Sequence, residues 1–135
     1  MTAPGDLMQA LFLRLKTDAS LSALLGGAGL LERVSDKAAF PYVTYGRTSA
    51  FNLESGADND NDQLVTFHVW SKTQSNSETL LIMESIKTRL DGAAFSIGSR
   101  GQTRLSLEFA ESRYDEDLAV HHGSLRFRAL TQDGI

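Results

Sequence analysis

Acidic residues at alternate positions are the first feature of this sequence whose types and spacing suggest chemistry. Asp58, Asp60 and Asp62 place carboxylates at every second position of the run ESGADNDND. An EF-hand calcium loop has oxygen ligands at positions 1, 3 and 5, glycine at position 6 and a bidentate glutamate at position 12. Here position 6 is Gln63 and position 12 is Val69. Because the sharp turn and the bidentate ligand are both missing, the spacing does not predict a specific calcium site.

The same acidic run, residues 54–62, accounts for the charge of the protein. The chain has 17 acidic and 13 basic residues and a net charge of −4. The run contains no base, and its acids equal the whole excess: Glu54, Asp58, Asp60 and Asp62. Its Asp, Asn, Gly and Ser residues favour turns, but it is longer than the 2–5 residues of a minimal hairpin loop. We therefore expect a mobile loop from about Phe51 to Gln63, either a solvated spacer or an arm that orders on a partner.

Histidines and serines are the other candidates for chemistry. His121 and His122 are adjacent, and adjacent residues on a strand point to opposite faces, which makes them poor ligands for one metal ion. No serine lies in a G-x-S-x-G or S-x-x-K motif, and residues 98–101 (GSRG) lack the length and the lysine of a phosphate loop. The absence of cysteine excludes disulfides and thiolate metal sites. We predict no enzymatic activity, no metal and no cofactor.

Three arginines lie on the polar sides of two predicted C-terminal strands: Arg104, Arg126 and Arg128. If the two strands pair, Glu108 can form an ion pair with one of them across the sheet, worth at most about 1 kcal/mol. Alternatively, this charged face contacts a neighbouring subunit or passing DNA. Outside the acidic run the chain is neutral, so its composition gives no broad basic patch of the kind that marks nucleic-acid binding.

Hydrophobic periodicity predicts the elements that position these residues. Helical spacing predicts a helix over residues 6–16 and another that follows a capping box at residues 75–78 and closes at Asp91-Gly92. Asp18 is placed to cap a short helix that ends at Gly26-Gly27. Strands are predicted over residues 30–34, 41–53, 64–71, 104–109 and 125–129.

This order of elements predicts an α+β fold. We expect a single compact domain over residues 1–135, with a mostly antiparallel or mixed sheet and helices packed on one face. No apolar run approaches the roughly 20 residues of a membrane span, and the N-terminus lacks the pattern of a secretory signal. We therefore expect a cytoplasmic protein without a membrane partner, unless it is carried out within a particle.

Several motifs together resemble one family. They are FPYVTYG at residues 40–46, HVWS at 68–71, the capped helix that follows, and HGSLRFR at 122–128. Their order and spacing are similar to those of tail-completion, or tail-terminator, proteins of long non-contractile phage tails and of gene transfer agents. The resemblance covers nearly the whole chain.

The resemblance implies a structural role without catalysis or a cofactor. Its members form a homohexameric ring that caps the head-proximal end of the tail tube, stops tube polymerisation and joins the head-completion connector, while DNA passes through the lumen without specific binding. The expected location is the head–tail junction of a virion assembled in the bacterial cytoplasm. The alternatives are a head–tail adaptor or tube-like protein, or a small ligand-binding domain. The candidate partner-binding residues are Glu54, Asp58, Asp60, Asp62, Arg104, Arg126 and Arg128.

Overall fold

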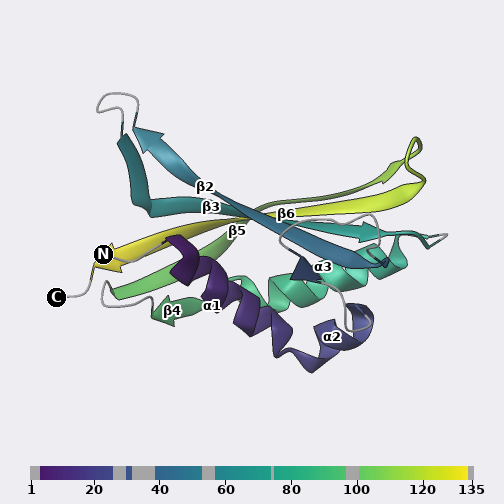
Figure 1. Ribbon diagram of the computed structural model, residues 1–135, viewed down its shortest axis with the longest axis horizontal. Coiled ribbons are helices and arrows are strands. Elements are labelled where there is room, and N and C mark those ends of the chain that lie inside the picture. Colours follow the sequence, from purple (N-terminus) through teal and green to yellow (C-terminus); the bar gives the residue numbers. More distant parts are fainter. Residues whose placement is uncertain are drawn as a thin grey trace.

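The computed structural model describes residues 4–25, 30–31, 39–52, 57–73, 75–96 and 101–133 (Figure 1). The predicted helices and strands occur in the expected order, and one short strand, β4, was not predicted. The elements are α1 (Pro4–Lys16), α2 (Ala19–Leu25), β1 (Leu30–Leu31), β2 (Tyr42–Asn52), β3 (Ala57–Ser71), α3 (Ser77–Leu90), β4 (Ala94–Ser96), β5 (Gly101–Asp115) and β6 (Val120–Asp133).

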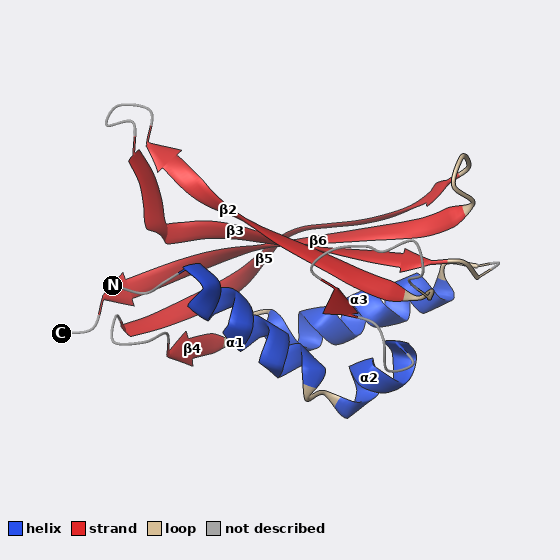
Figure 2. Cartoon of the chain, viewed as in Figure 1, coloured by secondary structure: helices blue, strands red, loops and turns tan. Residues whose placement is uncertain are grey.

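The strands form one curled sheet in the order β1-β2-β3-β6-β5-β4. The short strand β1 runs parallel to β2, and the other five strands pair antiparallel. Figure 2 shows the three helices on one side of this sheet. The predicted α+β fold, with a mostly antiparallel sheet and helices on one face, is confirmed.

One apolar core fills the space between the helices and the sheet. Successive turns of α1 and α3 contribute fully buried residues such as Leu11 and Ile86, which meet Phe67 of β3 and Phe127 of β6. The two phenylalanine rings pack edge to face with their centroids 5.9 Å apart. No helix in the described ranges is long and apolar enough to cross a membrane.

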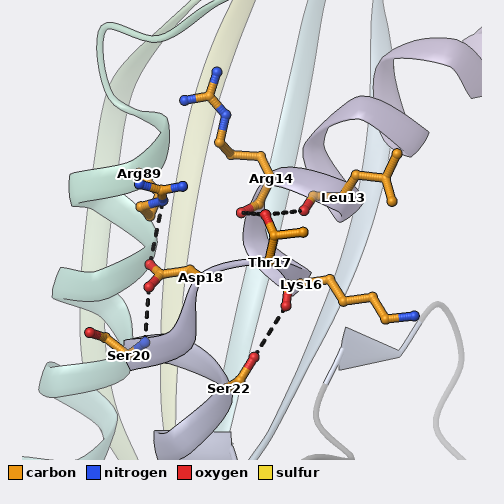
Figure 3. A network of polar contacts seen from close by, with 8 residues as sticks. All are labelled: Leu13, Arg14, Lys16, Thr17, Asp18, Ser20, Ser22 and Arg89. Carbon is orange, nitrogen blue, oxygen red and sulfur yellow. Dashed lines mark hydrogen bonds and ion pairs between the residues drawn. The ribbon is translucent and has the colours of Figure 1, made fainter.

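Polar contacts join the end of α1, the start of α2 and the side of α3 (Figure 3). The backbone N–H of Ser20 donates to the Asp18 carboxylate at 3.0 Å, which confirms Asp18 as the cap of α2. The same carboxylate lies 3.5 Å from Nε of Arg89 on α3. Thr17 closes the end of α1 by donating its hydroxyl to the Leu13 carbonyl at 2.8 Å. Gly26-Gly27, predicted to end α2, lies outside the described residues, as do residues 32–34 of the expected first strand.

The predicted capping box of α3 is wrong. The N-cap is Asn76, whose side chain makes no capping hydrogen bond. Ser75 Oγ accepts a long bond of 3.4 Å from the N–H of Ser77. Glu78 turns instead toward β3 and accepts a 2.6 Å hydrogen bond from the Ser71 hydroxyl. A buried hydroxyl at the end of a strand needs a partner, and this requirement outweighs the local capping pattern.

The strand predicted over residues 104–109 does not keep a regular alternation, because it is interrupted before Phe109. Leu105 and Phe127 lie on the helix-covered side as expected, but Phe109 is 42% exposed on the opposite side. The pairing of β5 with β6 shifts register between Leu107 and Phe109. A bulge inserts one extra residue, here Glu108, and so reverses the faces of every residue that follows.

Candidate functional site

The side of the sheet turned away from the helices is the candidate functional surface, and we call it the open face. In the described part of the chain no helix packs over it (Figure 1). Alternation along the strands places polar and aromatic side chains there, because their neighbours point into the core. The open face consists of Asp62, Leu64, Thr66, His68 and Trp70 on β3; Gln102, Arg104, Ser106, Phe109, Glu111 and Arg113 on β5; and His122, Ser124, Arg126, Arg128 and Leu130 on β6.

A cluster of rings lies at one end of the open face. Trp70 and His122 are cross-strand partners, and their rings stack with centroids 4.0 Å apart and an interplanar angle of 3°. His68 Nδ1 lies 2.8 Å from His122 Nε2. The indole N–H of Trp70 donates to the Thr44 hydroxyl of β2 at 3.3 Å. These contacts connect β2, β3 and β6 through side chains on the side that has no helix.

Both histidines of this cluster favour the neutral form. Burial lowers the pKa of His68. Burial also lowers the pKa of His122, and the charges of His68 and Arg113 lower it further, against the opposing effect of Glu111 and Asp115. Two neutral imidazoles can share one hydrogen bond, because one ring nitrogen donates while the other accepts.

The sequence interpretation missed this histidine pair. It considered His121 and His122, which are adjacent in the chain and point to opposite faces, whereas the pair consists of His68 and His122 from separate strands. The period of two along each strand could have placed both on the open face, but only the register of β3 against β6 brings them together. Within the described residues no group of three or more His, Asp or Glu could hold a metal ion.

Two of the candidate residues are paired with each other. Arg128 Nε donates to Asp62 Oδ1 at 2.8 Å, and a second guanidinium nitrogen of Arg128 contacts the other carboxylate oxygen. This bidentate hydrogen bonding holds the pKa of Asp62 below its ordinary value. It also raises the pKa of Arg128, with a smaller contribution from Glu108. The sequence analysis paired Glu108 with one of the three arginines, but the ion-pair partner of Arg128 is Asp62 on β3.

The other two arginines lie on the open face, with different surroundings. The guanidinium of Arg126 lies over the ring of Phe109, 5.4 Å from its centroid, because the bulge in β5 brings this ring to the open face. Arg104 lines a shallow hollow of about 160 Å³ near β4. The structure therefore brings the three arginines to one surface, as the alternation predicted.

The acidic run is wrongly predicted as a loop. β2 continues to Asn52 and β3 begins at Ala57, so Asp58, Asp60 and Asp62 belong to a strand. Asp58 is the partner of Phe51 in the register. Residues 60–62 have no partners on β2, since Ser49 pairs with Gln63 and Ala50 with Asn59. Backbone pairing along β2 overrides the turn preference of Asp58 and its neighbours. Residues 60–62, which have no partner on β2, form a bulge.

The paired residues 50–52 and 57–59 form what we call the β2–β3 arm. Figure 1 shows this arm bending away from the rest of the sheet, as expected where a bulge interrupts a strand. Glu54 lies outside the described residues, as do all of residues 53–56. The pairing of β2 with β3 therefore extends to Asn52 and Ala57, further than the sequence predicted.

The comparisons with known proteins identify the family. Residues 9–132 match the sequence model of the family described as tail completion protein gp17. This chain belongs to that family. Tail completion proteins are structural proteins of the tails of phages and phage-like particles and not enzymes, which confirms the predicted family and the absence of catalytic function.

Two solved structures share the tail completion fold. A chain in the virion of a native gene transfer agent particle is 24% identical, with a TM-score of 0.78 and coverage of 96% of each chain. The gp17 protein of bacteriophage SPP1 is 21% identical, with a TM-score of 0.63, over 93% of this chain and 88% of that one. No curated protein matches the chain. At these identities the two structures support the fold alone.

Proposed function

We propose that this tail completion protein forms a hexameric ring that ends the tail tube and joins it to the head-completion connector. The observation that carries this proposal is the family match, which spans residues 9–132. The match to a gene transfer agent virion chain over 96% of both chains supports it, because no large element has been added or lost relative to a subunit of an assembled particle.

The surface of the subunit supports assembly with other proteins. Large apolar side chains are exposed on both sides of the molecule, among them Leu81 of α3 and Leu130 of β6. A ring subunit needs separate surfaces for its two neighbours and for the layers above and below it. Exposed apolar area on several elements is consistent with that requirement.

We assign contact with the major tail-tube protein to the β2–β3 arm. The arm carries Asp58 and bends out of the sheet (Figure 1). Its acidic character favours a basic partner surface. The matched test is to delete residues 51–58 and join the strands with a two-residue Asn-Gly turn. We expect the fold to remain, as measured by circular dichroism, and tail joining to be lost. If the shortened protein still assembles normal particles, the arm is only a spacer.

DNA passing through the ring should slide without being gripped. Each phosphate that a protein neutralises adds affinity through counterion release. Arg128 is neutralised by Asp62, and the whole chain has a net charge of −4. The subunit therefore offers little net positive charge to the DNA, consistent with a lumen through which the genome moves.

The oligomeric state tests the ring. Native mass spectrometry at micromolar protein concentration, alone and with the tail-tube protein, should show a hexamer under at least one condition. A strict monomer under both would contradict the ring. Cryo-electron microscopy of particles should place the protein at the head–tail junction; density along the tube or on the portal side would favour the tube-like or adaptor role instead.

A further inference from the structure

A shallow hollow lies on the open face where β4 and the start of β5 meet the end of β6. Its lining combines two apolar side chains, Ala94 and Leu130, with Arg104, Gln102 and Ser106. Its volume of about 160 Å³ is below the roughly 300 Å³ at which small-molecule pockets begin. This is about the volume that five water molecules occupy in liquid water, so the hollow is large enough for a protein side chain.

Two side chains of this hollow, Leu130 and Arg104, lack contacts in the isolated subunit that a partner could supply. Leu130 is 46% exposed in it. Arg104 has no ion-pair partner among the residues that the structure describes. A guanidinium binds a carboxylate with two parallel hydrogen bonds. Covering the apolar surface of an exposed leucine is favourable. The hollow therefore fits a segment that carries a carboxylate next to an apolar side chain.

The turn between β5 and β6, residues 116–119, has that combination. Glu116 and Asp117 are exposed, and Leu118 is 60% exposed at the tip. The turn is fixed, because Asp115 Oδ1 accepts a 3.0 Å hydrogen bond from the N–H of Leu118. A preorganised turn loses little conformational entropy on binding. Figure 1 shows the tip projecting away from the helices, at the other end of the long hairpin from β4.

We propose that the β5–β6 turn of one subunit inserts into the hollow of a second copy of this chain. Leu118 then packs between Ala94 and Leu130, while Glu116 or Asp117 pairs with Arg104. One chain cannot make this contact with itself, because β5 separates Arg104 in the hollow from Glu116 in the turn by about 40 Å at ~3.3 Å per residue.

This contact joins two different surfaces, so it is heterologous, the type that closes into a ring when the rotation between copies permits. It rests on the proposed ring and specifies which surfaces form it.

Charge reversal separates this contact from other ways of making a ring. The hollow variant is Arg104→Glu, and the turn variant is Glu116→Lys with Asp117→Lys. Lys87→Glu on α3 is the matched control, with the same change of charge on an exposed side chain of the helix-covered side. We expect native mass spectrometry to show the ring for the wild type and the control, and its loss for the hollow and turn variants.

Mixing the two variants gives the sharper result. In an equimolar mixture each acidic turn meets an intact Arg104, and each lysine-bearing turn meets Glu at position 104. We expect the ring to return with equal numbers of the two chains, which the two different masses reveal. If the ring contact lies elsewhere on the surface, mixing has no effect, and the mixture behaves as the separate variants do.

The outcomes distinguish the contact from the ring itself. A ring that persists in the hollow variant, or two variants that do not assemble on mixing, would overturn the contact and leave the ring standing. A wild type that stays monomeric with and without the tail-tube protein would overturn both. Circular dichroism checks the fold of each variant, and Leu118→Ser gives a second turn variant that should also lose the ring without any change of charge.

Discussion

The two faces of the sheet use the same strands for different purposes. On β6, Phe127 and Ala129 are buried beneath the helices, whereas Arg126 and Arg128 between them are exposed. The apolar side chains of the covered face form one core with the buried faces of α1 and α3. The open face carries polar and aromatic side chains that contact one another in pairs and remain partly exposed to solvent. The comparison indicates that burial on one face determines stability, while the other face remains available for partners.

The largest expected difference between the faces is the cost of losing an aromatic ring. Phe67→Ala on the covered face should destabilise the protein by about 3–5 kcal/mol, because it leaves a cavity in a fully buried site. Phe109→Ala on the open face should cost about 1 kcal/mol or less, because this ring is 42% exposed and loses its contact with the Arg126 guanidinium. Urea unfolding followed by circular dichroism measures both. Equal losses would contradict the distinction between the faces.

Gly123 tests how tightly α3 packs on the covered face. A Cβ atom at this position would lie 2.5 Å from Met83 Sδ and 3.0 Å from Thr79 Cγ2. Gly123→Ala should therefore cost about 1–3 kcal/mol of unfolding free energy through overpacking. In a Met83→Ala background the same substitution should cost less, since the obstructing side chain is gone. An unchanged cost in that double-mutant cycle would show that the clash is with the Thr79 side chain or the backbone.

The histidine cluster predicts how the open face responds to acid, with an effect smaller than either core substitution. Because the folded state lowers the pKa of His68 and His122 from 6.5, the unfolded chain binds protons more readily. Stability should be complete above about pH 6.5 and fall as the pH drops through the lowered values. The variant with both histidines replaced by glutamine should show a flatter profile between pH 7 and 5 in thermal unfolding. An unchanged slope would assign the acid sensitivity to other groups.

The smallest expected effect is that of the ion pair on the open face. Asp62 and Arg128 are bidentate but partly solvated, with side chains 17% and 45% exposed. A double-mutant cycle of Asp62→Asn and Arg128→Gln should give a coupling of about 0.2–1 kcal/mol that weakens as salt is added. A coupling several times larger and independent of salt would mean that the pair is effectively buried and that the open face contributes to the core.

Most of the fold could be predicted from periodicity. Spacing of three and four residues located α1 and α3, and alternation located β3 and β6, because burial imposes these periods on any amphipathic helix or half-buried strand. The sequence predictions failed where a contact with a residue distant in the chain outweighed the local structural preference. Phe109 changes face at a bulge, Glu78 leaves its capping position for the Ser71 hydroxyl, and Asp58 lies in a strand in spite of its preference for turns.

Residue types at short spacing are enough to predict the element order, the apolar faces of the helices, the acidic segment in an otherwise neutral chain and the family motifs. Which distant residues meet follows from the three-dimensional fold. The register of β3 against β6 brings His68 to His122 and Asp62 to Arg128, and the bulge in β5 brings Phe109 under Arg126. Register and bulges follow from long-range backbone pairing and from packing of the whole sheet against the helices, and no local pattern in the sequence specifies them.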